Sequence, residues 1–584
     1  MLLSSIFAAA VGLSHASTSA ADAHFDWDGI EPSWDLEYTP CYGELQCARL
    51  LLPLDWLKPE DTSRTVAIAI AKLPAQVDAG DEAFGGTVIT NPGGPGDSGV
   101  IHMIRNGHYL QSMFDGEKRR HEILSFDPRG MFHSTPIADC YRRDQADSSL
   151  SQWQLQGFGL LGDSSTEQFR RRRAHAAAFG QRCALADKEQ SYIREHMSTA
   201  SVARDMLAMV DTIEELKRKE MRGGSEASRL ELRSDQVKNA ATEPRIQYYG
   251  TSYGTVLGNT FLSMFPGRVH RMVLDGLVVG EDYVNLEWST NLADTTKVVE
   301  YFYQACFAAR SRCALWRSSD ESWGSIKARV DQLIAQLDQD PQPVAIMGGP
   351  EGVITGVEVR TAFLDPLYDP LNRHEALAKT LDDALEGNYT LLLEQLGRSR
   401  KVDVCSAPAA QEEYTWLHHA NLAVNCGDGK DASGFDIAYW QSYVQRLKEI
   451  SPHMGDLWAE GTFSCSGWQI RPKYHFGGPF TSPAADPGLQ SGRPSAAPLL
   501  LSSLYDPVTP LRSAYRVGRG HPGSRVLVQR SVGHCAFLSS PSECTRRYIR
   551  EYMAEGKLPA EGAECEPDCV PFEDCPYEKA VLPR

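Results

Sequence analysis

The chain has 584 residues, and its 76 acidic against 58 basic side chains give a formal net charge of −18 at pH 7. This balance excludes nucleic acid as a partner, because backbone phosphates require clustered Lys and Arg and the sequence has no such stripe. With 42% hydrophobic and 23% charged residues, the chain has enough apolar side chains for a large core, which excludes an intrinsically disordered protein. The length predicts a large α/β core with a sizeable insertion.

Residues 1–20 read MLLSSIFAAAVGLSHASTSA, an apolar stretch followed by small residues. The pattern is typical of a secretory signal peptide, with Ala16 and Ala20 as candidate cleavage positions. No later apolar run reaches the roughly 18 residues that a membrane span requires. We therefore predict a secreted, extracellular protein with no membrane span.

The 14 cysteines are an even number, as expected of a protein exported to an oxidising compartment. Close neighbours in the sequence are candidate disulfide partners: Cys41 with Cys47, Cys306 with Cys313, and Cys535 with Cys544. The tail sequence ECEPDCVPFEDC lacks the paired C-x₂-C spacing of zinc sites, so it predicts disulfides there as well.

Short β-rich runs bounded by turn residues recur along the chain. Residues 21–80 predict early antiparallel strands. Six clearer runs follow at 87–90, 122–127, 245–250, 271–276, 498–506 and 525–531. Helical periodicity separates several of them, for instance at 201–219, which is the pattern of a mostly parallel sheet with helices on both faces. The predicted fold class is α/β.

The long segment between residues 276 and 498 has helical character and few strand signals, which predicts an inserted domain. The expected organisation is a signal peptide (1–20), N-terminal strands (21–80), the first part of the core (81–280), a mainly helical cap (281–494), the C-terminal part of the core (495–555) and an acidic, Cys-containing tail (556–584). Asn388 begins an Asn-x-Thr sequence in the cap and is a candidate glycosylation site.

A glycine-rich loop in TVITNPGGPGDSGV (87–100) follows the first clear strand. From Gly94 to Gly99 it matches G-x-G-x-x-G, the spacing of a dinucleotide-binding turn. In that turn a helix begins at the second glycine, whereas Pro92 and Pro95 stiffen the present loop. The alternative is a loop whose amides face the oxyanion of a reaction intermediate, and the next motif favours it.

In IQYYGTSYGTVLGNTF, Gly250, Ser252 and Gly254 form G-x-S-x-G between a predicted strand and a predicted helix. A nucleophile elbow needs this context, because only small residues two positions before and after the serine allow so tight a turn. We therefore predict Ser252 as a catalytic nucleophile. A serine at neutral pH also needs a histidine to accept its proton.

His534 in SVGHCAF follows the last predicted strand and is the candidate base. Asp506 in LYDPVTP ends the strand before it and is the candidate orienting acid, with Asp275 at another strand end as the competing choice. The chain order Ser252, Asp506, His534 is that of the α/β-hydrolases.

The predicted oxyanion donors are the amides of Gly94 and Tyr253, the latter directly following the serine. The sequence has no H-E-x-x-H pattern or other metal-ligand spacing. We therefore expect no cofactor and no metal. No pattern indicates a particular oligomeric state.

Five motifs in order, NPGGPG, FDPRG, GTSYGT, YDPVTP and GHCAF, resemble the secreted tripeptidyl aminopeptidase-like branch of the α/β-hydrolase superfamily, relatives of proline iminopeptidase. The resemblance extends from Cys41 to about Met553. It implies a serine exopeptidase that releases short peptides from substrates with a free N-terminus through an acyl-enzyme, with the cap as a lid. Family relatives bind the free amine with cap carboxylates, and Glu287 and Asp294 are candidates here.

The motif DPRGMFHS departs from that family's usual D-x-R-G-x-G-x-S, since Phe132 stands where glycine is common. A position that requires a positive φ would strain a phenylalanine. We expect Asp127 and Arg129 to hold this turn together and His133 to be a loop residue without a role as a base.

Two other functions fit parts of the sequence. The same catalytic residues cleave esters, so an esterase or lactonase that acts on small secondary metabolites is one alternative. A non-catalytic secreted binding protein is the other, although that interpretation expects a missing catalytic residue and the sequence contains all three.

Overall fold

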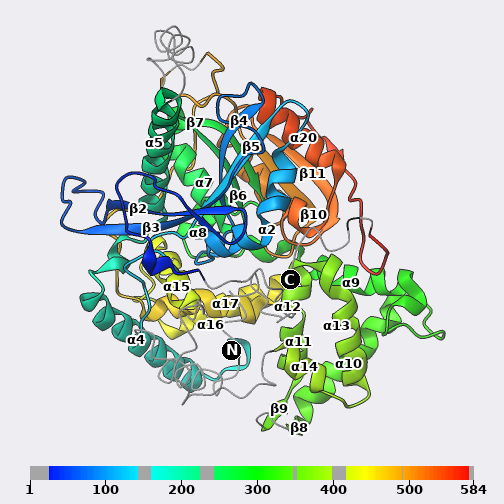
Figure 1. Ribbon diagram of the computed structural model, residues 1–584. Helices are drawn as coiled ribbons and strands as arrows, with labels where there is room; N and C mark the ends of the chain where they lie inside the picture. Colours follow the sequence, from blue (N-terminus) through cyan, green and yellow to red (C-terminus); the bar gives the residue numbers. More distant parts are fainter. Residues whose placement is uncertain are drawn as a thin grey trace.

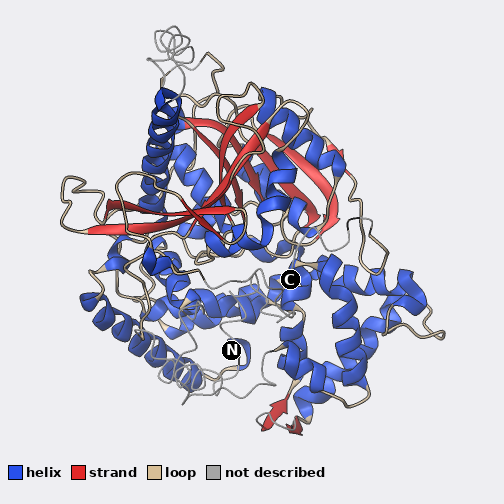
Figure 2. Ribbon diagram, viewed as in Figure 1, coloured by secondary structure: helices blue, strands red, loops and turns tan. Residues whose placement is uncertain are grey.

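The computed structural model describes residues 25–141, 160–223, 243–345, 351–396, 416–488, 491–575 and 577. The predicted signal peptide and Cys405 lie outside these ranges. In the described part, one ten-stranded sheet forms the core (Figures 1 and 2). Its strands, in spatial order, are β1 (Thr39–Cys41), β2 (Leu45–Pro53), β3 (Thr65–Leu73), β5 (Arg120–Phe126), β4 (Phe84–Asn91), β6 (Ile246–Thr251), β7 (Val269–Asp275), β10 (Leu499–Tyr505), β11 (Arg525–Val532) and β12 (Glu564–Cys565).

The pairing of these strands confirms the predicted α/β class. β2 and β3 pair antiparallel, and β3 pairs antiparallel with β5. From β5 through β4, β6, β7, β10 and β11 every neighbouring pair is parallel, so these strands place their carboxyl ends along one edge. Residues that follow the strands therefore meet at that edge, although they come from distant parts of the sequence.

Helices cover both faces of the sheet because successive strand residues point to opposite sides. In β4, Val88 packs into one apolar cluster and Ile89 into the other. The first cluster contains α2 (Gly99–Phe114) and α20 (Glu543–Glu555), and the second contains α5 (Thr199–Gly223) and α7 (Tyr253–Met264). Figure 1 shows this three-layer core with the cap below it.

The chain between β7 and β10 contains most of the cap helices, in two groups. The first group contains α9 (Thr295–Ala309), α10 (Trp323–Gln339), α11 (Gly356–Ala362), α12 (Leu364–Tyr368), α13 (Pro370–Leu385), α14 (Thr390–Gln395) and the hairpin of β8 (Gln342–Ala345) and β9 (Glu351–Ile354). The second contains α15 (Leu417–Asp428), α16 (Ile437–Ile450) and α17 (Gly455–Ser464). The short helix α8 (Gly280–Val284) leads into the cap, and α18 (Leu511–Gly518) follows β10.

One cap helix comes from a different part of the sequence. Helix α4 (Thr166–Glu189) precedes β6, within the segment 81–280 that we expected to be core. Its Phe169 packs edge-to-face on Phe463 of α17, and its Arg172 forms a buried ion pair with Glu460. This side of the cap is therefore built from two segments, α4 before β6 and α17 after β7. The order of strands along the sequence does not predict that α4 belongs to the cap.

Six disulfides are present in the described part of the chain, and two of the predicted pairs, Cys41–Cys47 and Cys306–Cys313, are among them. The other bridges are Cys140–Cys183, Cys426–Cys465, Cys544–Cys565 and Cys569–Cys575.

The predicted pair Cys535–Cys544 is wrong. Cys544 on α20 bonds to Cys565 of β12, whereas Cys535 is a buried free thiol that donates to the main-chain oxygen of Asp275. Cys544 faces the tail because the tail adds β12 to the edge of the sheet beside β11.

The turn after β5 differs in one respect from our expectation. Asp127 does hold the turn, since its carboxylate accepts the amide of His133 at 3.1 Å. Arg129 instead points away from the turn and forms a fully buried ion pair with Asp205 of α5. Phe132 has φ +35°, so the position does require a positive φ, and its ring packs against His133.

The Arg129–Asp205 pair yields a stability prediction. Asp205→Asn should lower the free energy of unfolding by about 3–5 kcal/mol, because it leaves a buried guanidinium without its counter-charge. The matched control is Asp211→Asn on the same helix, where the carboxylate is 53% exposed and pairs with Arg268 at the surface. That variant should lose less than about 1 kcal/mol. Urea unfolding followed by circular dichroism measures both, and equal losses would contradict this account.

Candidate active site

The turn between β6 and α7 holds Ser252 in a backbone conformation that non-glycine residues rarely adopt, with φ 56° and ψ −125°. Its amide donates to the main-chain oxygen of Asp275 at 3.0 Å. Such strain persists only where the surroundings impose it, and it occurs most often at functional sites. The G-x-S-x-G pattern therefore folds into the sharp strand–turn–helix that a nucleophile elbow requires.

The two glycines of the motif are required by space. A Cβ on Gly250 would lie 2.4 Å from the carbonyl oxygen of Gly254, and a Cβ on Gly254 would lie 2.6 Å from that of Asn91. Neither position can hold a larger residue without moving the main chain. Strand β6, the turn and the end of β4 are thus packed backbone against backbone.

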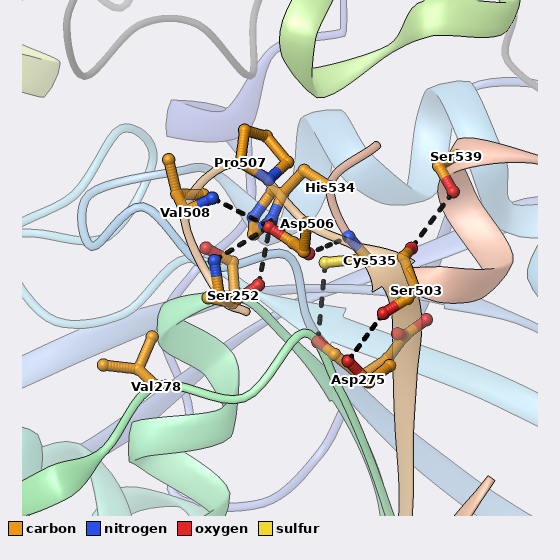
Figure 3. Close-up of polar contacts among 12 residues, drawn as sticks. Ser252, Asp275, Val278, Ser503, Asp506, Pro507, Val508, His534, Cys535 and Ser539 are labelled. Atoms are coloured by element: carbon orange, nitrogen blue, oxygen red, sulfur yellow. Dashed lines mark hydrogen bonds and ion pairs between the residues drawn. The ribbon is translucent and has the colours of Figure 1, made fainter. Parts of the chain in front are cut away.

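His534 and Asp506 are in direct contact (Figure 3). Nδ1 of His534 lies 3.1 Å from both carboxylate oxygens of Asp506. Asp506 is fully buried and also accepts the amides of Val508, Thr509 and Cys535 at 2.8–2.9 Å. Burial alone would raise the pKa of Asp506, but His534 and these hydrogen bonds hold it below its ordinary value.

These contacts determine the tautomer of His534. An ionised carboxylate only accepts hydrogen bonds, so Nδ1 carries the proton that it shares with Asp506. Nε2 is then left with a free lone pair, and it has no hydrogen-bond partner among the described residues. An imidazole in this state can accept a proton from a hydroxyl group.

Asp275, the competing acid, has other partners. Its carboxylate accepts the amides of Ala536 at 2.6 Å and Phe537 at 3.1 Å, at the start of the short helix α19 (Ala536–Ser539). The hydroxyl of Tyr249 donates to it as well. Burial raises the pKa of Asp275 to about 6. Asp275 therefore fixes the segment after His534 and does not contact the imidazole.

The glycine-rich loop after β4 lies against the serine turn. A Cβ on Gly93 would be 2.9 Å from Cβ of Ser252 and 3.1 Å from the amide nitrogen of Tyr253. Gly93 itself uses its amide to donate to Oδ1 of Asn91. Gly94, with φ +100°, follows immediately and has no acceptor for its amide among the described residues. The loop thus packs directly against the turn that carries Ser252 and Tyr253.

Asp97 lies in the same loop, and no sequence motif predicts a role for it. Its side chain is 4% exposed, and neither carboxylate oxygen has a hydrogen-bond partner in the described structure. Burial raises the pKa of Asp97 to about 7, while the nearby charges of Arg105 and His534 oppose that rise. A lone buried carboxylate beside a candidate catalytic histidine is costly to maintain.

The cap closes over His534 at helix α12. The ring of Tyr368 lies edge-on to the imidazole at 4.8 Å, and its main-chain oxygen accepts the amide of His534 at 2.9 Å. Glu287 lies in surface ion pairs with Lys430 and Arg446, so its carboxylate already has cationic partners.

The other cap residues that we singled out lie as follows. Asp294 pairs with Lys297, and Asn388 is exposed. Within the described ranges, no helix is both long and apolar enough to cross a membrane. The same ranges contain no group of three or more His, Cys, Asp or Glu that could hold a metal ion.

Comparison with known proteins adds three relatives. The chain is 23% identical over 542 residues to serine protease Hip1 of Mycobacterium tuberculosis, with 91% of each chain covered. It is 23% identical over 575 residues to tripeptidyl aminopeptidase of Streptomyces lividans, with 96% of this chain and 90% of that one covered. It is 25% identical over 529 residues to carboxylesterase B of Mycobacterium tuberculosis, with 89% and 86% covered. Residues 451–565 match the family model of TAP-like proteins.

The mostly parallel sheet, the strained serine turn and the paired histidine and aspartate define the chain as a serine hydrolase with the α/β-hydrolase fold. The relatives narrow this class. The chain is a serine peptidase that is similar to TAP-like proteins of the α/β-hydrolase superfamily.

Asp97 provides a pH-dependent stability prediction. Its pKa is about 7 in the folded protein against an ordinary value of 3.8, so the folded chain retains a proton that the unfolded chain has lost. The free energy of unfolding should therefore fall between about pH 4 and about pH 7 and stay low above that range. The Asp97→Asn variant lacks this titration. Its free energy of unfolding, relative to that of the wild type, should therefore rise from pH 4 to pH 7 by on the order of 1–4 kcal/mol.

Chemical unfolding at several pH values tests this expectation. The control is Asp78→Asn, which changes an exposed aspartate in the loop before β4 and should follow the wild-type pH dependence. If the Asp97→Asn and wild-type curves stay parallel from pH 4 to pH 8, Asp97 is already ionised in the folded state and the explanation from burial fails.

Proposed function

We propose that this protein is a secreted serine exopeptidase that releases short peptides from substrates with a free N-terminus through an acyl-enzyme. One observation carries the proposal: the imidazole of His534 is held by Asp506 at 3.1 Å with Nε2 free, at the sheet edge where Ser252 is strained into its turn. The names of the relatives, tripeptidyl aminopeptidase above all, support a peptide substrate.

The proposed reaction uses only residues of this chain. Oγ of Ser252 attacks the scissile carbonyl carbon while its proton passes to Nε2 of His534. Collapse of the tetrahedral intermediate breaks the C–N bond, and the leaving amine takes the proton from His534. A water molecule then attacks the ester by the same proton route and frees the acid. Asp506 stabilises the imidazolium that forms in both steps.

The amides of Gly94 and Tyr253 are the proposed donors to the intermediate's oxyanion. Two features support this role: Gly94 has a positive φ, and Tyr253 lies in the first turn of α7. Neither amide has a partner in a regular helix or strand, so both are available to bind an oxyanion. An oxyanion donor acts through its main-chain amide and not through its side chain, so a glycine and a tyrosine serve equally well here.

Secretion and glycosylation belong to the same proposal. The six disulfides of the described chain are typical of an oxidising compartment, and the N-terminal sequence pattern is that of a signal peptide. Asn388 lies exposed between α13 and α14, where a glycan would not disturb the core.

Ester hydrolysis is the second candidate function. One relative of the chain, 25% identical over 529 residues, is named carboxylesterase B. A similar chain therefore has a name that indicates ester hydrolysis. The catalytic residues are common to both reactions, and only the cap can select the substrate.

The two buried aspartates should separate in function. Asp506→Asn should lower kcat by on the order of 10⁴, because the imidazole loses the partner that fixes its tautomer. Asp275→Asn should lower kcat far less and should mainly reduce thermal stability, since its carboxylate accepts two main-chain amides and the hydroxyl of Tyr249. Steady-state rates with the melting temperature of each variant measure this, and a reversed order would reassign the acid.

Directionality is tested with a short chromogenic peptide offered with a free and with an acetylated N-terminus. The free peptide should be cleaved at least tenfold faster, because a desolvated ammonium ion needs an oxygen partner under the cap that an acetyl group cannot use. Ser252→Ala supplies the blank, and a chelator should change neither rate. Equal cleavage rates on both peptides would contradict exopeptidase activity. An acetate ester assayed in parallel would reveal esterase activity.

A further inference from the structure

Helix α15 of the cap lies in backbone contact with the glycine-rich loop after β4. A Cβ on Gly96 would be 3.1 Å from the carbonyl oxygen of Leu417 and 3.2 Å from the amide nitrogen of Asn421. Gly96 also has φ +109°, so only glycine fits both the turn and the contact. One side of the loop is therefore set by a helix of the cap.

A side-chain hydrogen bond reinforces this contact. Nδ2 of Asn421 donates to the main-chain oxygen of Pro95 at 2.7 Å, and Asn421 is fully buried. One turn further along α15, Nδ2 of Asn425 donates to Oδ1 of Asn421 at 2.9 Å. Because the oxygen of the Asn421 amide is engaged by Asn425, its NH₂ group must face Pro95. Pro95 directly follows Gly94, so this bond holds the loop one residue after the first proposed oxyanion donor.

The last residue of α15 reaches the other side of the site. Oδ2 of Asp428 accepts the hydroxyl of Thr199 at 2.5 Å, and that hydroxyl lies 2.5 Å from the hydroxyl of Tyr253. A threonine hydroxyl has one proton, and because Thr199 donates it to Asp428, the hydroxyl of Tyr253 donates to Thr199. Tyr283 adds a further bond to the same oxygen. The side chain of the second proposed oxyanion donor is thus tied to the same helix.

Asn421, Asn425 and Asp428 are spaced by four and three residues, so they share one face of α15. The disulfide Cys426–Cys465 fixes this end of the helix to the segment after α17. We propose that α15 positions both halves of the oxyanion hole, with Asn421 holding the Gly94 side and Asp428, through Thr199, holding the Tyr253 side. The proposal rests on the assignment of Gly94 and Tyr253 under the proposed function.

The physical consequence is specific to the transition state. Oxyanion donors act when they lie about 2.7–3.1 Å from the developing charge, and a drift of about 1 Å removes much of their effect. The bound substrate carries no such charge. Loosening α15 should therefore slow acylation and leave substrate binding almost unchanged.

The first test is Asn421→Ala, measured on a peptide substrate and on a p-nitrophenyl ester. We expect kcat to fall about 10- to 100-fold with KM within about threefold. The inhibition constant of a peptide aldehyde, which forms a tetrahedral adduct with the serine, should weaken by the same factor as kcat. Inhibition by the free peptide product should not change. The matched control is Asn372→Ala, which removes the bonds to Asp369 at the start of α13 and should leave all these constants as in the wild type.

Two further variants separate the two halves of the proposal. Asn425→Ala should act only through the Asn421 amide, so adding it to Asn421→Ala should cost nothing more. Thr199→Val removes the hydroxyl between Tyr253 and Asp428, and its effect on kcat should multiply with that of Asn421→Ala. If Asn421→Ala does not fold, Asn425→Ala leaves the bond to Pro95 in place and still predicts a several-fold loss in kcat.

Three outcomes would overturn the proposal. Unchanged kcat and aldehyde affinity with a lower melting temperature would make α15 a purely structural element, and a raised KM with unchanged kcat would make it a substrate contact. Additive effects of Asn421→Ala and Asn425→Ala would break the link between them. This test can be distinguished from a failure of the proposed exopeptidase function. An ester substrate forms the same oxyanion, so the effect of each variant can be measured on the ester alone.

Discussion

The structure depends on one constraint, the backbone packing of two glycine-rich turns at the carboxyl ends of β4 and β6. The loop after β4 leaves no side-chain space beside the strained turn at Ser252, since a Cβ on Gly93 would lie 2.9 Å from Cβ of Ser252. Main-chain amides, which have no rotamers, are then placed by the fold itself. Such preorganised dipoles are the cheapest way to meet charge that appears only in a transition state.

Two buried aspartates divide the support of His534. Asp506 holds the ring, while Asp275 accepts the amides of the two residues after Cys535 and also receives the amide of Ser252 on its main-chain oxygen. The same residue therefore fixes the turn of the serine and the segment after the histidine. The difference in pKa follows the partners: His534 and the donating amides hold the pKa of Asp506 below its ordinary value, whereas burial raises that of Asp275 to about 6.

The sequence predicted what is local and missed what is long-range. The fold class and the six clear strands follow from periodicity, and Ser252, Asp506 and His534 lie after strands whose ends must meet in a parallel sheet. The partner of Cys544 depends on how the tail returns to the sheet edge, and that of Arg129 lies 76 positions away on α5. Likewise, no spacing rule links Pro95 with Asn421, which are 326 positions apart.

Two of the contacts between the cap and the catalytic loops have a mechanistic meaning. Helix α12 covers His534 through Tyr368, whereas α15 holds the loop of Gly94 and, through Thr199, the side chain of Tyr253. A lid that only shaped a pocket would need neither contact, since a substrate can be selected from above without any bond to the loops below. Because both helices bond or pack directly against these loops, a cap that shifts must also disturb the proposed oxyanion donors and the base. Substrate selection and catalytic geometry are then coupled through the same insertion, so exchanging the cap of such an enzyme should change the rate constant as well as the specificity.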